Sequence, residues 1–337
     1  MAEMTPYERT LARMAGQPVD RLPNQNIVMA YAAHFIGATY DQLASDYRVL
    51  VEANLRCTEA FHMDWISAIS DPVREASAFG ADVELAYDRV PACRAPLLAS
   101  YADWNKLALW DPWEKVRTRD RLLAVQLYRE KVGGYYPIVG WIEGAAASAA
   151  QLRGVASFLE DTMTEPQATR DLLEITAQAA IRFALAQLEA GADMIGLGDA
   201  VCSLLSPRAY REFGLPYEQR IIQAIHNAGG KVKLHICGNT TRHLADMAKT
   251  GADIVDVDWM APYAEAIRLM RGVSVNGNFD PVGVLLQGTA EQVAEAARAC
   301  HAARDERSMI SAGCEVPVGT PAENLLAHYR VLVEAGA

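Results

Sequence analysis

Short apolar runs rich in β-branched residues recur along the chain, and segments with helical periodicity separate most of them. Runs of this length are typical of buried strands, and an alternation of strands with helices favours a parallel sheet. Eight such units are what a closed (β/α)8 barrel requires. The eight candidate strands are residues 26–30, 65–70, 136–141, 194–198, 232–236, 254–257, 273–276 and 309–312.

The alternation predicts an α/β fold, a single TIM (β/α)8 barrel domain that spans residues 1–337. Residues 79–111, between the second and third candidate strands, are long and irregular, and we interpret them as an insertion at the barrel mouth. A doubly wound open sheet is the alternative. The first candidate strand is not followed by the G-x-G-x-x-G sequence of a dinucleotide site, which counts against that alternative.

Several helix ends carry recognisable start and stop signals. Ser206, followed by proline, predicts the start of one helix over residues 206–227, which the glycines after it end. Thr289 predicts a capping box before the helix that ends near His301. In the same way, Thr320 followed by proline and Glu323 predicts a capped start for the last helix.

The charge balance and the cysteine content narrow the class of protein. Lys and Arg number 31 against 42 Asp and Glu, so the formal net charge is −11, and we expect no nucleic-acid partner because such partners require a basic face. No run approaches the ~18 apolar residues of a membrane span. The N-terminal segment lacks the apolar core of a signal peptide. Six cysteines in a chain of 337 residues without a recognisable signal peptide indicate reduced thiols rather than disulfides, and we expect a cytoplasmic protein.

The segment 231–239 carries the most informative chemistry. His235 and Cys237 are two residues apart on a predicted strand, so both side chains face the same side near its end. Cys314 follows the last predicted strand, at the same rim of the barrel. Zinc accepts mixed nitrogen and thiolate ligands, and three protein ligands leave one place for water or substrate, as in catalytic sites. The pattern predicts a catalytic zinc site, with a metal-free pair of rim residues as the alternative.

Other polar residues lie close to the predicted strand ends. Glu315 and Glu143 are both candidates for the fourth metal position at rest. A carboxylate is expected to orient His235 through its second ring nitrogen, and Asp199 is one candidate while Asp256 and Asp258 compete for the role. We take three residues as candidate catalytic groups and three as candidate substrate contacts. They are Glu143, Asp199 and Asn276 for catalysis, and His34, Asp71 and Asn278 for substrate.

Two sets of residues have a structural interpretation as well. The segment from Asn276 to Asp280 and its following proline could equally form a turn. Aromatic residues gather in and just after residues 79–111, and we interpret them as packing of the insertion, with a wall for an aromatic substrate as the alternative. These aromatic residues are Tyr87, Tyr101, Trp104, Trp110 and Trp113.

Three motifs together resemble the uroporphyrinogen decarboxylase superfamily, and more narrowly its zinc- and corrinoid-dependent methyltransferase branch. The opening residues 7–23 are also similar to the start of that family. The motifs read H-I-C-G-N-T at 235–240, N-G-N-F-D-P at 276–281, and G-C-E-V-P-x-x-T-P-x-E-N-L at 313–325. The branch's His-x-Cys…Cys zinc motif corresponds to His235, Cys237 and Cys314, which the resemblance therefore implies as zinc ligands.

The resemblance implies a zinc enzyme that takes a methyl group from a small methylated substrate, such as an aryl methyl ether or another O- or N-methyl compound. The acceptor is the cobalt(I) of a corrinoid held by a partner protein. Transfer from a methylated corrinoid to a thiol or a folate is the alternative, and a non-catalytic binding protein is a further one. A homodimer is an open expectation, because barrel relatives often pair.

The decarboxylase of the superfamily is a poorer match. Its porphyrinogen site uses an arginine-rich motif after the first strand, where residues 29–35 of this chain contain no arginine to bind the substrate's carboxylates. Asp71 alone resembles that enzyme's pyrrole-binding aspartate. We therefore do not expect porphyrinogen decarboxylation.

Overall fold

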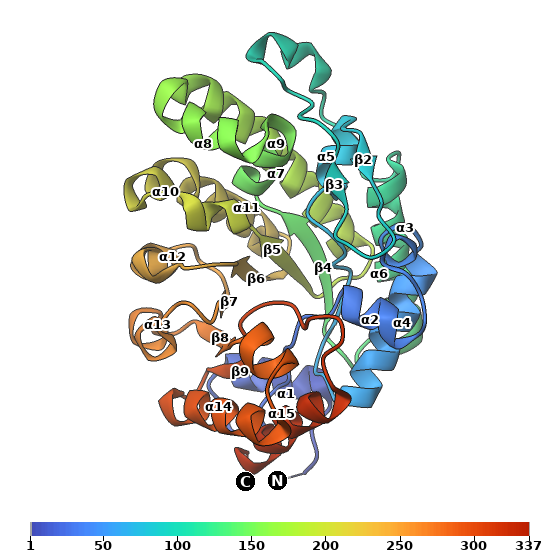
Figure 1. Ribbon diagram of the computed structural model, residues 1–337, viewed down its shortest axis with the longest axis vertical. Coiled ribbons are helices and arrows are strands. Elements are labelled where there is room, and N and C mark those ends of the chain that lie inside the picture. The colour runs from blue at the N-terminus through green and yellow to red at the C-terminus, as the bar shows by residue number, and fades with distance from the viewer. Residues whose placement is uncertain (1, 337) are drawn as a thin grey trace.

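The computed structural model describes residues 2–336, and seven of its strands form one curled parallel sheet, in the order β1-β4-β5-β6-β7-β8-β9. Helices surround this sheet, and the two ends of the chain lie close together (Figure 1). The predicted barrel-type α/β fold is confirmed. The strands are β1 (Ile66–Ser67), β4 (Ile138–Glu143), β5 (Met194–Gly198), β6 (Lys231–Ile236), β7 (Ile254–Val257), β8 (Ser274–Phe279) and β9 (Met309–Ala312).

The helices follow the strands in the alternation that the sequence predicts. The α-helices are α1 (Pro6–Met14), α2 (Ala30–Phe35), α3 (Tyr40–Ser45), α4 (Tyr47–Phe61), α5 (Arg74–Phe79), α6 (Val116–Val132), α7 (Ala145–Arg153), α8 (Val155–Thr164), α9 (Pro166–Glu189), α10 (Pro207–Phe213), α11 (Leu215–Asn227), α12 (Leu244–Met247), α13 (Tyr263–Leu269), α14 (Ala290–Ala303) and α15 (Ala322–Glu334). Shorter helical turns are η1 (Tyr101–Lys106), η2 (Ala200–Leu204), η3 (Thr241–His243) and η4 (Pro281–Leu286). Within residues 2–336, no helix combines the length and apolar character needed to cross a membrane.

The first predicted strand, residues 26–30, is wrong in detail. Only an isolated parallel bridge joins Ile27 to Glu315, and α2 already begins at Ala30. The segment nevertheless lies between β1 and β9, because the Asn26 carbonyl accepts from Trp65 Nε1 and the Asn26 side chain accepts from Ala312 N. The Asn26 side chain thus accepts the Ala312 N–H, which in a regular sheet would bond to a backbone carbonyl.

Two of the predicted helix signals also need correction. The helix expected over residues 206–227 is two helices, α10 and α11, which meet at Gly214. A Cβ there would lie 2.5 Å from the Tyr210 ring, and the proline at position 216 lacks the N–H that a continuous helix would use. The Thr320 hydroxyl donates to the Pro317 carbonyl rather than capping α15. The capping box at Thr289 is confirmed.

The insertion between β1 and β4 contains a small antiparallel hairpin, β2 (Val83–Glu84) with β3 (Ala92–Cys93), and then η1. Trp110 packs edge-on against Phe79 and Phe183. Tyr101 and Trp104 stack on each other. These contacts support the packing interpretation for Tyr101, Trp104 and Trp110, whereas Tyr87 and Trp113 are exposed.

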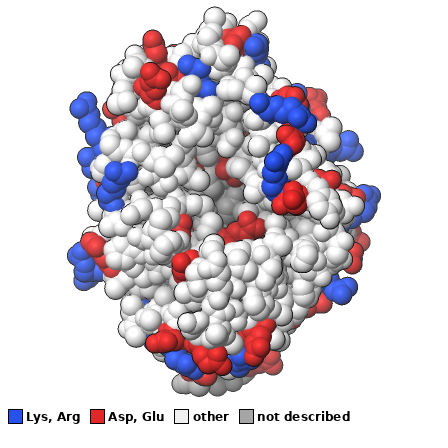
Figure 2. Space-filling model, in the orientation of Figure 1, with Lys and Arg blue, Asp and Glu red and all other residues white. Residues whose placement is uncertain are grey.

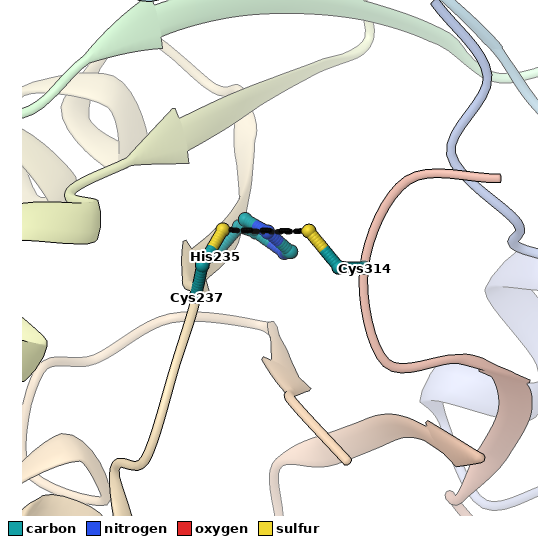
Figure 3. A group of neighbouring side chains, drawn as sticks. All are labelled: His235, Cys237 and Cys314. Carbon is teal, nitrogen blue, oxygen red and sulfur yellow. Dashed lines mark hydrogen bonds between the residues drawn. The ribbon is translucent and has the colours of Figure 1, made fainter. Parts of the chain in front are cut away.

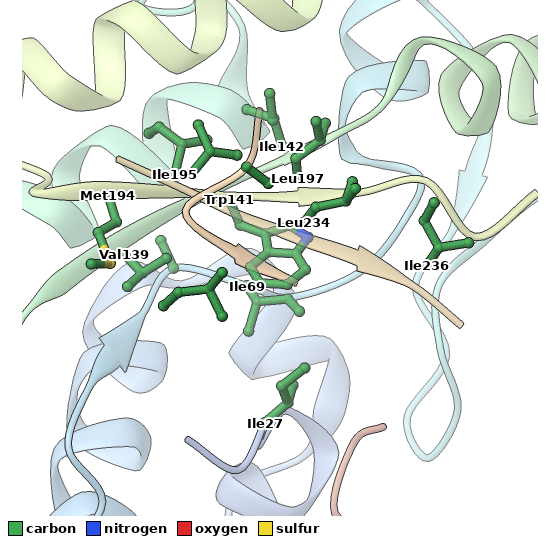
Figure 4. Close-up of a cluster of buried hydrophobic side chains, with 14 of the residues drawn as sticks. Ile27, Ile69, Val139, Trp141, Ile142, Met194, Ile195, Leu197, Leu234 and Ile236 are labelled. Carbon is green, nitrogen blue, oxygen red and sulfur yellow. The ribbon is translucent and has the colours of Figure 1, made fainter. Parts of the chain in front are cut away.

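The apolar core lies where β4, β5 and β6 meet the segments on either side of β1. Each large apolar side chain buried there stabilises the fold by about 1.5–3 kcal/mol. Figure 4 shows the cluster, which contains Ile27, Ile69, Val139, Trp141, Ile142, Met194, Ile195, Leu197, Leu234 and Ile236.

Candidate metal centre and cavity

Three metal-ligand side chains converge at the carboxyl ends of the strands. His235 is the second-last residue of β6, Cys237 lies just beyond the strand, and Cys314 follows β9 (Figure 3). Cys237 Sγ lies 2.9 Å from His235 Nε2 and 3.5 Å from Cys314 Sγ. Cys314 Sγ lies 3.7 Å from His235 Nε2. The structure thus brings together the three residues that the sequence selects from stretches 77 residues apart.

A hydrogen-bonded chain holds the His235 ring from behind. His235 Nδ1 lies 3.0 Å from Asp256 Oδ2, which leaves Nε2 directed at the two sulfurs. Asn276 Nδ2 donates to Asp256 Oδ1 at 2.8 Å, and the Ser311 hydroxyl donates to Asn276 Oδ1 at 2.9 Å. Lys233 Nζ lies 2.9 Å from Asp256 Oδ1. A carboxylate on the second ring nitrogen fixes the tautomer and orientation of a ligating histidine.

The charges around the ring explain its protonation. Burial lowers the pKa of His235, but the hydrogen bonds to Asp256 and Cys314 outweigh this effect and raise the pKa to about 10. Burial disfavours the charged form of Asp256, yet Lys233 and His235 hold its pKa at about 2. Cys314 is the thiolate of the pair: hydrogen bonding from Cys237 lowers its pKa to about 4, while that of Cys237 is raised. The electrostatics thus favour a Cys314 thiolate beside a protonated His235, which must release its Nε2 proton to ligate a metal.

The three donors fit a zinc ion. Their ligand atoms all lie within 4.8 Å of one another, and one nitrogen with two sulfurs is a set that zinc binds well. Among residues 2–336, no fourth His, Cys, Asp or Glu joins this group. Neither Glu143 nor Glu315, the two candidates for a fourth ligand, belongs to it. A four-coordinate zinc held by these three residues would have one place left for a molecule that enters from the cavity.

A cavity of ≈ 230 Å³ opens beside the donors. Figure 2 shows a hollow at the centre of this face, with acidic atoms in and around it. The lining is mostly apolar, with a few polar groups, as is typical of sites for small molecules. The lining residues are Ile27, Met29, Ile69, Asp71, Pro72, Val90, Trp141, Glu143, Gly198, Ala200, His235, Cys237, Cys314 and Glu315.

Two glycines of β5 make room for the largest side chains of this lining. In the register of β4 with β5, Trp141 pairs with Gly196, and Glu143 pairs with Gly198. A Cβ on Gly196 would lie 2.0 Å from Trp141 Cε3, and one on Gly198 would lie 3.3 Å from Glu143 Oε1. The glycines therefore allow the indole and the carboxylate to lie across β5 toward His235, whose ring centroid is 6.2 Å from that of Trp141.

The carboxylates of the cavity have different partners. Asp71 forms an ion pair with Arg117 at 2.5 Å, and Glu315 Oε1 accepts from Ala30 N at 2.8 Å. Burial raises the pKa of Glu315 to about 7 and that of Glu143 well above its usual range. Glu143 is 6% exposed, and within residues 2–336 no group donates a hydrogen bond to its carboxylate. Glu143, a candidate catalytic group, and Asp71, a candidate substrate contact, thus both line the cavity.

Three predicted site residues lie elsewhere. Asp199 is not the orienting partner of His235, since Asp256 makes that contact and Asp199 Oδ1 accepts from Ala147 N. Asn278 gives its amide to the carbonyls of Asp258 and Ala261, so its side chain is occupied within the fold. His34, on α2, lines a separate small cavity beside the insertion.

The turn alternative for residues 276–280 is wrong from Asn276 to Asn278, which belong to β8, and is supported only at Asp280. Its carboxylate accepts from Val282 N and Gly283 N and so caps η4. Sequence reasoning missed the apolar wall of the cavity, Trp141 above all. The signal was present, because Trp141 and Glu143 are two residues apart on one strand and so share a face.

A second group of possible ligands lies away from the cavity opening. Asp199, Cys202 and Glu218 have ligand atoms within 4.8 Å of one another, and all three are fully buried. Asp199 Oδ2 and Glu218 Oε1 have no hydrogen-bond partner, while Glu218 Oε2 accepts from the Tyr210 hydroxyl at 2.6 Å. Burial raises the pKa of Asp199 to about 7 and that of Glu218 to about 8. Burial therefore disfavours the charged form of both carboxyls.

Comparison with known proteins agrees with the geometry. A family model described as uroporphyrinogen decarboxylase (URO-D) matches residues 5–334. A methylcobamide:CoM methyltransferase from Methanosarcina acetivorans is 29% identical over 335 residues, with 96% of each chain covered. A uroporphyrinogen decarboxylase from Nostoc punctiforme is 29% identical over 303 residues, 85% of this chain and 83% of its own.

A solved structure described as a methyltransferase from Methanosarcina mazei has a TM-score of 0.90 at 25% identity, with 99% of this chain and 100% of that chain covered. The resemblance to the methyltransferase branch is confirmed by these relatives, which match over nearly their whole length.

Proposed function

Because the chain belongs to the uroporphyrinogen decarboxylase (URO-D) family, we propose that it is a corrinoid-dependent methyltransferase with a catalytic zinc. One observation carries the proposal: one imidazole and two thiols meet at the carboxyl ends of the barrel strands and face a small cavity. Active sites of this fold lie at that end of the barrel. The methyltransferases among its relatives resemble the chain over 96% or more of its length.

His235, Cys237 and Cys314 would hold the zinc, with Asp256 and Asn276 fixing the direction of the imidazole. When bound, the zinc supplies Lewis acidity toward an oxygen, nitrogen or sulfur of the substrate. Trp141, Met29 and the other apolar residues of the cavity exclude water from the methyl group. The corrinoid belongs to a partner protein, which must approach from the open side of the cavity, because the space inside is sufficient only for a small molecule.

We propose demethylation as the direction of transfer: a small methylated donor loses its methyl group to the reduced corrinoid of the partner. Transfer from a methylated corrinoid to a thiol is the second candidate. It is favoured by the relatives named methylcobamide:CoM methyltransferases. In both directions the substrate atom that carries or receives the methyl group would lie beside the three donors.

Porphyrinogen decarboxylation fits the site poorly. The cavity of ≈ 230 Å³ is lined by carboxylates, and within the described part of the chain no arginine or lysine lines it. A tetrapyrrole that carries many carboxylates would require cationic partners there.

The experiment is a transfer assay with reduced cobalamin and a panel of O-methyl and N-methyl donors, together with methylcobalamin and small thiols as the reverse panel. We expect zinc-dependent transfer with at least one compound, lost on chelation and recovered when zinc is restored. Activity that survives complete removal of zinc, or decarboxylation of a porphyrinogen, would contradict the proposal.

A further inference from the structure

The substrate cavity has an acidic lining without a matching cation. Three carboxylates line it, those of Asp71, Glu143 and Glu315, and within residues 2–336 no lysine or arginine does. In Figure 2 acidic atoms lie in and around the central hollow, and a group of Lys and Arg atoms interleaved with acidic ones lies just to its right. Two buried guanidinium groups act on these carboxylates: Arg117 pairs with Asp71, and Arg74 pairs with Glu75 and also favours the charged form of Glu143.

Glu143 is the carboxylate that lacks a partner. Asp71 has its ion pair with Arg117, and Glu315 accepts a backbone hydrogen bond. The Glu143 side chain is buried, lines the cavity and receives no hydrogen bond from residues 2–336. A buried carboxylate of this kind is costly in its charged form unless a cation or a donor enters beside it.

An aromatic side chain, Trp141, lines the cavity together with this carboxylate. Trp141 and Glu143 project from the same side of β4, and both line the cavity. The remaining walls are apolar, from Ile27, Met29 and Ile69 among others. An indole beside a carboxylate in an apolar pocket is the chemistry that recognises a quaternary or tertiary ammonium group, through cation–π attraction and charge pairing.

We propose that the cavity selects a small cationic N-methylated compound, a methylated ammonium, and disfavours an anionic thiol. This inference rests on the proposed function, because it names the substrate class of the same site. The cationic head would lie between Glu143 and Trp141, with its nitrogen on the side of the three metal ligands and one N-methyl group directed at the open side of the cavity, from which the corrinoid approaches. A sulfonate or carboxylate tail in the same place would meet carboxylates and no cation.

The test compares binding of a matched pair of probes to the zinc-loaded protein by isothermal titration calorimetry. Choline is the cation, and 3,3-dimethylbutan-1-ol is its uncharged carbon analogue of the same shape. We expect choline to bind about tenfold more tightly, a preference of the size that one cation–π and carboxylate site provides. 2-Mercaptoethanesulfonate, an anionic thiol, should bind more weakly than choline.

Two variants show whether Glu143 provides the preference. Glu143→Gln keeps the shape of the side chain and should reduce the preference for choline to less than about threefold, with the zinc content unchanged. Glu52→Gln, on the exposed side of α4, is the control and should keep the full preference. Equal binding of the two probes, tighter binding of the sulfonate, or an undiminished preference in Glu143→Gln would overturn the inference.

The transfer assay separates this inference from the proposed function. Zinc-dependent transfer restricted to anionic or uncharged compounds would leave the function standing and overturn the cation preference. A clear preference for choline in a protein that transfers methyl groups with no compound of either panel would support the cation site and contradict the proposed function.

Discussion

Two groups of potential metal ligands lie in the same barrel, and they differ in access and in charge. His235, Cys237 and Cys314 border a cavity, and the two cysteines are partly exposed. Asp199, Cys202 and Glu218 are fully buried. In the first group a positive ring faces a thiolate, whereas in the second burial favours protonated carboxyls. Proximity of ligand atoms is therefore common to both groups, and access from the cavity distinguishes the first, which we propose as the metal centre.

The largest expected effect is on zinc content. Cys237→Ser and Cys314→Ser should each fall from about one zinc per chain to near zero, because a hydroxyl is a far poorer zinc ligand than a thiolate. Cys202→Ser is the matched control from the buried group and should keep its zinc. Metal analysis of the purified proteins decides the comparison. Full zinc in both Cys237→Ser and Cys314→Ser, or loss of zinc from Cys202→Ser, would contradict the assignment of zinc to the first group.

A smaller effect is expected on stability, at the buried group. The pKa of Glu218 is about 8 in the fold, against about 4.3 in an unfolded chain. Below pH ~4 both states hold the proton, and the group costs nothing. As the pH rises toward about 8, the unfolded chain releases the proton first, so the folded state loses stability, on the order of a few kcal/mol.

Glu218→Gln should remove this cost, since an amide does not ionise. We expect the thermal midpoint of the variant to exceed that of the unchanged protein at pH 9, and the difference to shrink toward pH 5. Thermal denaturation at several pH values measures it. A constant difference across this range would show that the buried carboxyl does not change its protonation on unfolding.

Much of the fold could be predicted from the chain because seven of the eight apolar runs correspond to strands of the sheet. The eighth run is residues 26–30, and its sequence pattern does not reveal that it forms no regular strand. Its backbone is joined to its neighbours partly through the Asn26 side chain, and this depends on distant residues such as Trp65 and Ala312. Likewise, the break at Gly214 depends on the close approach of the Tyr210 ring.

The three donors could be predicted because parallel strands end at one rim, whatever their register. The carboxylate that orients His235 could not be predicted, since Asp199 and Asp256 both lie near the carboxyl ends of strands that neighbour β6. Register decides between them: His235 pairs with Asp256, and Asp256 pairs with Asn276, so the three side chains share a face. Register arises from packing of the whole sheet, which a single sequence does not display.

The most direct test of the metal centre is X-ray absorption at the zinc edge of the protein as isolated. The account predicts a zinc with one nitrogen and two sulfur ligands from the chain, and a fourth, light-atom ligand that changes when a substrate is added. A zinc with no sulfur ligand, or with four ligands that no added compound alters, would contradict it.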